Sequence, residues 1–326
     1  MPQTYDIRLI APSGYPQSAE AMQRGIARLE AAGHRVSGLE VLSRRELRFA
    51  GSDAQRAADI NALADPSREL PDIALAIRGG YGAHPILPLL DYDGLAKRLR
   101  DAPIALVGQS DFTAVQCALY AKSGLITLGG PMLGGDFGAV HLDELTWKSF
   151  WQTLSSAEGS ATWAAPATVD LAVEGPVWGG NLAMLAGLVG TPYFPAIEGG
   201  ILVVEDLAEP PYRVERMLYQ LLHAGVLRRQ AALVMGDFIN YRVTEYDNGY
   251  DVDVAFDRIA AASGVPVVRG LPFGHGPSKF TLPFGAPARL RVAAGEAALT
   301  FTGHPGRKPR KIPGRAAADP PQDNRT

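Results

Sequence analysis

The sequence is poor in cysteine and has no long apolar run. Cys117 is the single cysteine among 326 residues, so no disulfide framework can form, and we expect a reducing compartment, the cytoplasm. Nowhere do about 18 apolar residues follow one another, as a membrane-spanning helix would need. The stretch MPQTYDIRLIAPSGYP has no basic segment followed by an apolar one. We therefore expect neither a membrane span nor a secretion signal.

No charge of one sign dominates either. Lysine and arginine number 31 against 34 aspartates and glutamates, and the net charge of -3 gives no field that would attract nucleic acid or an anionic membrane. The hydrophobic fraction of 47% is that of a globular protein. A chain of this length is too long for one ordinary core and suits two domains.

The first half of the chain alternates short apolar runs with helical patterns. The runs YDIRLIAP, IALAI (73–77) and IALVG (104–108) are typical of strands, and each leads through a turn into a helical stretch. This alternation predicts a three-layer α/β domain over residues 1–150, with a parallel sheet between helices. Sites in such sheets lie at the carboxyl ends of strands, where Ser110 and the glycine turn RGGYG (78–82) are found.

The second half has a different composition. Residues 151–170 are rich in Ser, Ala, Thr and Gly, which predicts an interdomain linker. Beyond it, GILVVED and AALVMGDF indicate strands on either side of the helix PPYRVERMLYQLLHAG, and residues 287–302 indicate a hairpin. We expect a smaller, β-rich mixed α/β domain over residues 171–305. Residues 306–326 are rich in proline and nearly free of apolar residues, as in a disordered tail.

Several motifs fail to support a cofactor. RGGYGAHP does not match the spacing of a dinucleotide-binding loop, and no phosphate-binding lysine follows it. No paired cysteines or HExxH motif occur, and HLDE (141–144) lies at an expected helix start, so we expect no metal site. Cys117 falls within an expected helix and is interpreted as a buried structural thiol. We therefore expect no cofactor.

Ser110 stands between a strand and a helix, in GQSDF. A serine hydroxyl needs a base to act as a nucleophile, and the amides of a following helix can stabilise an oxyanion. Gly108 fits the nucleophile-elbow pattern GxSxG, whereas Phe112 replaces its second glycine. Serine before a helix is also a common N-cap. From this stretch alone, Ser110 is either a cap or a nucleophile.

His275 has the most unusual setting of the six histidines. Its segment GLPFGHGPSKF places a glycine on each side, which permits close approach of the backbone, whereas we expect the other five to be solvated. Glu205 and Asp206 end the strand ILVVED and are candidates to orient an imidazole. Alternatively, Asp206 or Glu209 caps the next helix. The chain order Ser, Glu, His occurs in one class of triad enzymes.

Taken together, five segments resemble the serine carboxypeptidase family of LD-carboxypeptidases and microcin-immunity peptidases (peptidase family S66). They are RGGYGAHPILPLLD, GQSDFTA, WGGNLAML, EDLAEPPYRVERML and GLPFGHGP. The resemblance implies a triad of Ser110, Glu205 and His275, with an oxyanion hole from the amides of Gly80 and Asp111. It also implies an α/β N-terminal domain, a smaller β-rich C-terminal domain, a site at their interface, a homodimer, and no metal or cofactor.

The resemblance suggests a substrate class as well. It implies cleavage of the bond before a C-terminal D-amino acid in a murein tetrapeptide, as in peptidoglycan recycling. Arg78 is a candidate to bind the peptide carboxylate or to brace the glycine turn by an ion pair. Asn181 is a candidate to bind the peptide backbone or to take a left-handed turn conformation.

Two residues depart from the family pattern. Gln109 precedes the serine where an aromatic or small residue is usual, and Gly129 stands where many members have histidine. Either could alter the pocket wall. Three alternatives stay open: a peptidase acting on aminoacyl-nucleotide or related toxic conjugates, a non-catalytic peptide- or anion-binding protein, and a nucleotide held by the glycine turn.

Overall fold

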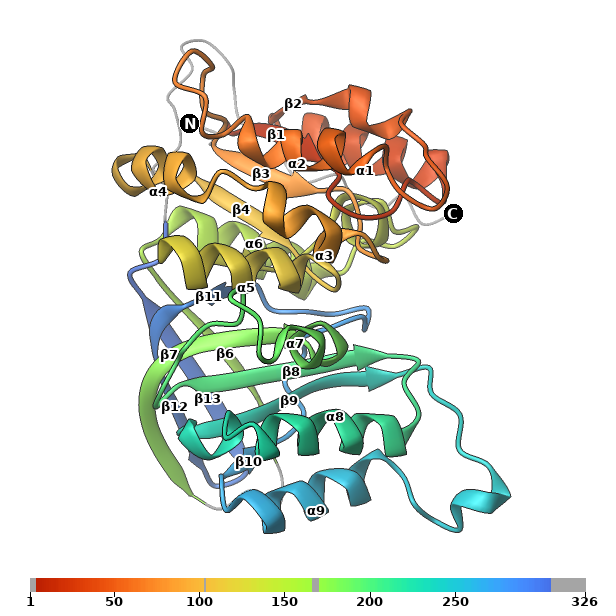
Figure 1. The fold of residues 1–326 in the computed structure, drawn as a ribbon, viewed down its shortest axis with the longest axis vertical. Helices are drawn as coiled ribbons and strands as arrows, with labels where there is room; N and C mark the ends of the chain where they lie inside the picture. The colour runs from red at the N-terminus through yellow and green to blue at the C-terminus, as the bar shows by residue number, and fades with distance from the viewer. Residues whose placement is uncertain (1–3, 103, 166–169, 306–326) are drawn as a thin grey trace.

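The computed structural model describes residues 4–102, 104–165 and 170–305. Its helices and strands form two stacked bodies, each built on one sheet (Figure 1). The expected tail, 306–326, and residues 166–169 of the expected linker lie outside the described residues. Among the described residues, no helix is long and apolar enough to cross a membrane.

The first sheet has the strand order β11-β5-β4-β3-β1-β2, and all its neighbours are parallel except β11 and β5. Its strands are β1 (Asp6–Ile10), β2 (Arg35–Ser37), β3 (Ile73–Ala76), β4 (Ala105–Gly108), β5 (Thr127–Gly129) and β11 (Leu282–Phe284). Strand β11 follows His275 in the chain, so a short segment of the C-terminal half completes the N-terminal sheet.

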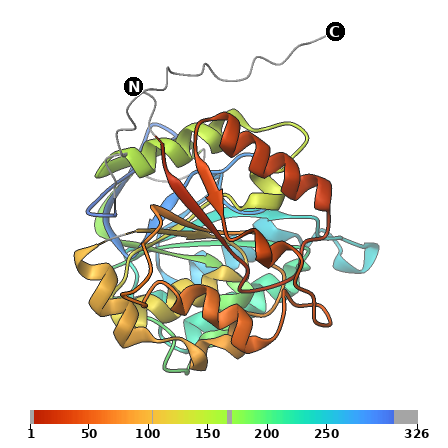
Figure 2. The same ribbon diagram turned by 90° about the horizontal axis from the view of Figure 1, so that it is seen from above.

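Helices cover both faces of this sheet, which confirms the predicted three-layer domain (Figures 1 and 2). The helices are α1 (Ala19–Ala31), α2 (Asp53–Asn61), α3 (Ala83–Ile86), α4 (Tyr92–Asp101), α5 (Phe112–Ser123) and α6 (Glu144–Ser155), with short helices at Leu39–Leu42, Leu87–Leu89 and Leu133–Phe137. Apolar residues of α1 and α6 pack on one face of the sheet, and those of α2 to α5 pack on the other.

The second sheet has the order β10-β9-β8-β7-β12-β13-β6. Its strands are β6 (Glu158–Ala164), β7 (Leu171–Asn181), β8 (Ile201–Leu207), β9 (Ala232–Ile239), β10 (Val267–Val268), β12 (Ala286–Ala293) and β13 (Glu296–Thr302). The pairs β7–β8, β8–β9 and β9–β10 are parallel, and the pairs β7–β12, β12–β13 and β13–β6 are antiparallel. The expected mixed, β-rich domain is thereby confirmed, including the hairpin β12–β13.

Three helices of the C-terminal half pack on one face of this sheet: α7 (Leu182–Leu188), α8 (Pro211–His223) and α9 (Val252–Ser263). Their buried residues belong to the same apolar cluster as those of α5, so the two bodies share a core. The shared core fixes the carboxyl ends of β3 and β4 against those of β7 and β8, where the candidate residues lie.

Most of the described part of the expected linker, residues 151–165, belongs to a helix and a strand instead. Its first residues complete α6, and residues 158–164 form β6 along the edge beside β13. Ala161 and Trp163 alternate with exposed residues, and the Trp163 indole donates to the carbonyl of Arg269 at 2.9 Å. A composition of small polar residues obscured this period-two pattern, which is that of a half-buried strand.

Candidate active site

Ser110 occupies a strained turn between β4 and α5. Its φ is +63°, a left-handed conformation that residues other than glycine rarely adopt. Its carbonyl accepts from the amide of Thr113, and no side chain caps α5, so the hydroxyl is not a helix cap. The capping alternative is therefore wrong for Ser110, and the turn presents its side chain to a cavity.

The glycine turn lies directly against Ser110. Gly80 and Gly82 have φ of +109° and +146°, which only glycine adopts without strain. A Cβ at Gly79 would stand 2.8 Å from Ser110 Cβ and 2.9 Å from its Oγ. The turn therefore needs glycine at these positions for its shape and for its approach to the serine.

Arg78 begins this turn and lines the cavity half-buried. Its Nη1 donates to the carbonyl of Tyr15 at 3.0 Å, and no carboxylate within the described ranges forms an ion pair with it. Burial lowers the pKa of its guanidinium below the ordinary value, although an arginine stays charged at neutral pH. The bracing ion pair considered above is absent there, which leaves a cation on the cavity wall.

Asp111 is buried behind Ser110. Its Oδ2 accepts from the Ser13 hydroxyl at 2.6 Å and from the amide of Ala83 at 2.8 Å. Burial raises the pKa of this carboxyl, and these two hydrogen bonds oppose the rise. The carboxylate thus connects the loops that follow β1 and β3 to the residue beside Ser110.

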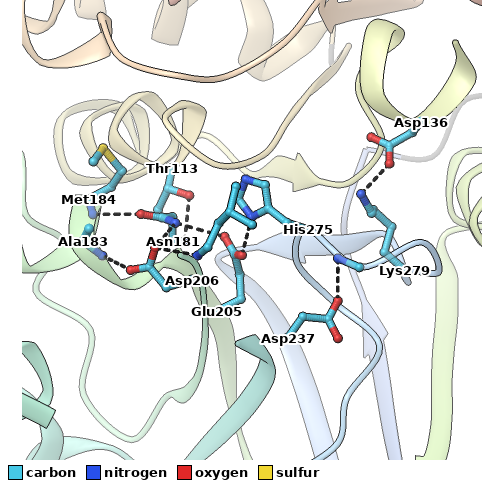
Figure 3. A network of polar contacts seen from close by, with 12 residues as sticks. Thr113, Asp136, Asn181, Ala183, Met184, Glu205, Asp206, Asp237, His275 and Lys279 are labelled. Atoms are coloured by element: carbon cyan, nitrogen blue, oxygen red, sulfur yellow. Dashed lines mark hydrogen bonds and ion pairs between the residues drawn. The ribbon is translucent and has the colours of Figure 1, made fainter. Parts of the chain in front are cut away.

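Glu205 and His275 meet across 70 positions of sequence. The Glu205 carboxylate, fully buried in β8, lies with Oε2 2.7 Å from His275 Nδ1 (Figure 3). Since a carboxylate only accepts, Nδ1 carries the proton and Nε2 of the neutral ring is an acceptor. Burial alone would lower the pKa of His275, but the hydrogen bond and charge of Glu205 outweigh it, and the net pKa is raised.

The glycines beside His275 make this approach possible. Gly274 has a φ of +136°, and a Cβ there would stand 3.0 Å from Glu205. Gly276 donates its amide to Asp237 Oδ2 at 3.0 Å, and a Cβ there would stand 2.5 Å from the same oxygen. The close backbone approach expected from the flanking glycines is confirmed.

Asn181 and Asp206 complete a buried polar network behind Glu205 (Figure 3). Asn181 Nδ2 donates to Glu205 Oε1 at 3.3 Å and to Asp206 Oδ1 at 3.0 Å, while its Oδ1 accepts from the Met184 amide. Its φ of -64° is not left-handed, because Gly179 and Gly180 make the turn before it. Asp206 accepts from Ala183 in α7 and does not cap α8.

The carboxyl group of Asp206 has a raised pKa. Burial raises the pKa of its carboxyl to about 6, with the neighbouring Glu205 charge acting in the same direction. Three hydrogen bonds, from Asn181 Nδ2 and the amides of Leu207 and Ala183, limit the shift. Asp206 is therefore an anchor for the end of β8 and the start of α7.

One cavity of about 540 Å³ joins these groups at the seam between the two bodies. Its wall comprises the start of α1, the glycine turn, Ser110 and Asp111, the ends of β7 and β8, the start of α7, and His275, together with Met132, Gly134 and Gly135. Within the described ranges, no hydrogen bond joins the Ser110 hydroxyl to His275. The resemblance-derived candidates Ser110, His275, Gly80, Asp111, Arg78 and Asn181 all line it, and Glu205 lies behind His275.

Sequence reasoning missed the contacts that hold the His275 segment. Lys279 forms a buried ion pair with Asp136, which follows the cavity-lining glycines 134 and 135 (Figure 3). The Ser278 hydroxyl donates to Asp143 at 2.7 Å, and the amide of Thr281 donates to the Ser149 hydroxyl at 2.9 Å. No local signal pairs positions more than 130 apart, so these partners were not predictable from one sequence.

The remaining histidines differ in burial, and His141 and His223 are exposed as expected. His304 is buried, with Nε2 2.8 Å from the carbonyl of Thr153, so the expectation that it is solvated is wrong. His34 is half-buried, and desolvation lowers its pKa to about 4. Cys117 is buried in α5 as expected, and burial raises the pKa of its thiol. Among the described residues, no group of three or more His, Cys, Asp and Glu could hold a metal.

The fold and the cavity define a two-domain α/β protein whose serine turn faces a glutamate–histidine pair across the domain seam. Family models identify it further: the LD-carboxypeptidase N-terminal domain matches residues 7–130, and the C-terminal domain matches residues 174–290. The chain belongs to the LD-carboxypeptidase family, a family of peptidases, as the resemblance implied.

Individual relatives agree with this assignment. A murein tetrapeptide carboxypeptidase of Pseudomonas aeruginosa is 31% identical over 87% of this chain and 92% of its own. The crystal structure of a muramoyltetrapeptide carboxypeptidase from Oxalobacter formigenes superposes with a TM-score of 0.84 at 42% identity, covering 92% of this chain and 99% of its own. The microcin C7 self-immunity protein of Escherichia coli is 27% identical over 80% of this chain and 83% of its own.

Proposed function

We propose that this chain is a serine carboxypeptidase that hydrolyses the bond before a C-terminal D-amino acid in murein tetrapeptides. The observation that carries the proposal is the 2.7 Å contact between Glu205 and His275, made at the cavity into which the strained Ser110 turn opens. A buried carboxylate that fixes an imidazole beside a serine is the arrangement by which triads activate a hydroxyl. Membership of the LD-carboxypeptidase family supports the substrate class.

The proposed reaction runs in two halves. His275 Nε2 takes the proton of Ser110 Oγ as the oxygen attacks the peptide carbonyl, and Glu205 stabilises the imidazolium. The amides of Gly80 and Asp111 receive the oxyanion. The leaving D-amino acid takes the proton from His275, and an acyl-enzyme remains on Ser110. Water, deprotonated by His275, then attacks the ester, and the collapse returns the proton to Ser110 and releases the tripeptide.

Arg78 is proposed to bind the terminal carboxylate of the substrate. It is a cation on the cavity wall, and one guanidinium nitrogen already fixes it to Tyr15. Asn181 lines the same cavity, but both hydrogens of its amide nitrogen are directed to Glu205 and Asp206. We therefore propose that the Asn181 side chain orients Glu205 and does not bind the peptide backbone directly.

The pH dependence has a defined direction. The general base must be neutral, and Glu205 raises the pKa of His275 against the effect of burial. Activity should therefore rise with pH through that raised pKa and fall on the acid side.

The alternative substrate class is an aminoacyl-nucleotide or related conjugate, and it is favoured by the similarity to the microcin self-immunity protein. A nucleobase site is commonly built on an aromatic side chain that stacks on the base. Among the described residues that line the cavity there is no phenylalanine, tyrosine or tryptophan, and the one aromatic ring, that of His275, is held by Glu205. Trp178 in β7 is buried, and its indole donates to Gln230. The lining of the cavity therefore favours a peptide substrate over a nucleotide conjugate. A non-catalytic peptide-binding role is the second alternative.

Product analysis tests the proposal. Purified protein is incubated with a muramyl tetrapeptide ending in D-alanine, and the tripeptide is sought by mass. Ser110→Ala should lower turnover by roughly a million-fold, whereas Ser43→Ala, at an exposed serine outside the cavity, should not. A fluorophosphonate probe should label wild type but not Ser110→Ala. Labelling without peptide turnover would favour the conjugate class, and no labelling would favour a binding protein.

Two further features are part of the proposal. We propose that the chain forms a homodimer and acts in the cytoplasm, as the family resemblance implies. Light scattering of the purified protein and cell fractionation with a periplasmic marker test these two points separately.

A further inference from the structure

The Gly82–Ala83 peptide group ends the glycine turn and is bound at both of its polar atoms. On one side, the Ala83 N–H donates to Asp111 Oδ2 at 2.8 Å. On the other, the Gly82 carbonyl accepts from Nη1 of Arg56. A peptide unit is planar, so fixing its N–H and its C=O fixes the orientation of the whole plane.

Arg56 is unusual for an arginine in the middle of a helix. Its side chain in α2 is fully buried, and it also donates to the carbonyls of Pro12 at 2.7 Å and Gly51 at 3.3 Å. A Cβ at Gly82 would stand 2.6 Å from its Nη1. The guanidinium therefore donates to three loop carbonyls at once. Its planar group of several N–H donors can do this, whereas the single ammonium of a lysine is less suited to it.

Asp111 connects this assembly to the nucleophile. It follows Ser110 directly, and its Oδ2 also accepts from the Ser13 hydroxyl. Its own amide is one of the two proposed oxyanion donors, and its carboxylate holds the end of the turn that carries the other, Gly80. The position of one donor relative to the other thus depends on the buried Asp111 side chain, together with Arg56 on the other side of the peptide plane. A displacement of about 1 Å at such a site can cost about a hundredfold in rate.

We propose that the side chains of Asp111 and Arg56 are positioning residues that orient the oxyanion hole by holding the Gly82–Ala83 peptide plane between them. This inference rests on the proposed function for its kinetic consequence. The restraint on the turn itself does not depend on which substrate is cleaved. Neither side chain is expected to touch the substrate.

The experiment compares Asp111→Ala, Asp111→Asn and Ser13→Ala with wild type. Asp111→Ala removes both hydrogen bonds and should lower kcat on the tetrapeptide by about a hundredfold while KM changes little. Asp111→Asn keeps an oxygen for the Ala83 amide and should restore most of kcat. Ser13→Ala leaves the turn contact intact and should cost less than tenfold. Asp59→Asn is the matched control, because Asp59 accepts from the Ala11 amide but not from the glycine turn.

Two further readouts separate positioning from general damage. A peptide boronate, whose tetrahedral adduct places an oxygen between the donors, should lose affinity in proportion to kcat, whereas the tripeptide product should bind unchanged. Amide hydrogen exchange across residues 79–84 should be faster in Asp111→Ala and unchanged in Asp59→Asn. If Asp111→Ala does not fold, Arg56→Lys is measured in the same way.

The outcomes are distinct. Unchanged exchange in the turn, an unchanged kcat, or an equal loss of boronate and product binding would each overturn the positioning role. If wild type cleaves no peptide, the proposed function fails, and the exchange measurement alone decides whether Asp111 holds the turn.

Discussion

Replacing Glu205 by glutamine should abolish most activity while leaving the shape of the site intact. In wild type, Glu205 Oε1 accepts from Asn181 Nδ2 and Oε2 lies on His275 Nδ1. A glutamine must offer its oxygen to Asn181, because that amide nitrogen can only donate. Its own NH2 group then faces Nδ1 of His275. The ring would be held with its proton on Nε2, where it cannot accept the proton of Ser110.

The expected loss has two parts. A charge-assisted hydrogen bond is worth roughly 1.5–3 kcal/mol, or about 10- to 150-fold in stabilising the imidazolium. The wrong tautomer adds to this, and the corresponding change in a serine protease triad lowers kcat by about 10⁴. We expect a similar loss for Glu205→Gln. The acid limb of the pH–activity profile of Glu205→Gln should also move to lower pH. The substitution removes the Glu205 charge that raises the pKa of His275, whereas the burial that lowers this pKa remains.

The assay is tetrapeptide turnover between pH 5 and 9, with Glu198→Gln, an exposed residue, as the control. In an Asn181→Ala background the glutamine is free to turn its oxygen toward His275, so the same substitution should cost less there. Activity of Glu205→Gln within tenfold of wild type would refute the role of this carboxylate. An equal cost in both backgrounds would refute the tautomer argument.

Three other perturbations test the surroundings of the site. Gly79→Ala should lower kcat by at least tenfold, because its Cβ would collide with Ser110; unchanged kinetics would show that the turn yields freely. Lys279→Met leaves Asp136 buried without its cation and should cost about 3–5 kcal/mol of unfolding free energy in urea, with a loss below 1 kcal/mol contradicting it. Because burial raises the pKa of Asp206 to about 6, its contribution to stability is fully present below the unfolded value near 4 and is lost as pH rises through 6. Wild type should therefore lose unfolding free energy relative to Asp206→Asn between pH 4 and 7, by up to about 3 kcal/mol, and parallel pH curves would contradict the shift.

The local patterns of the sequence predicted much of the fold. The continuous apolar run IALVG marks a buried strand, and the helical spacing of apolar residues marks α8. Each signal lies within a few residues, and the positions of both elements agree with the structure. The position of Ser110 at a strand end followed from the same alternation. Strand β6 did not, because small polar residues weakly mark a strand whose burial depends on a distant partner.

The candidate site divides in the same way. The glycines around His275 indicated close packing without showing what was packed against them, and Glu205 supplied the answer only through the tertiary fold. Arg56 gave no signal, since an arginine among alanines in a helix usually lies at the surface. Asn181 followed two glycines and suggested a left-handed turn, but the glycines themselves absorb that turn.

Strand β11 has a consequence for how the molecule comes apart. The segment that carries His275 runs from β10 in the second sheet to β11 in the first. Between these strands, its Ser278 hydroxyl donates to Asp143 at the start of α6. Separating the two halves would break the pairing of β11 with β5, so the segment that carries His275 is anchored in both sheets. We expect thermal unfolding to be one cooperative transition. An isolated C-terminal fragment should not hold His275 in place, because β11 would lack its partner strand β5.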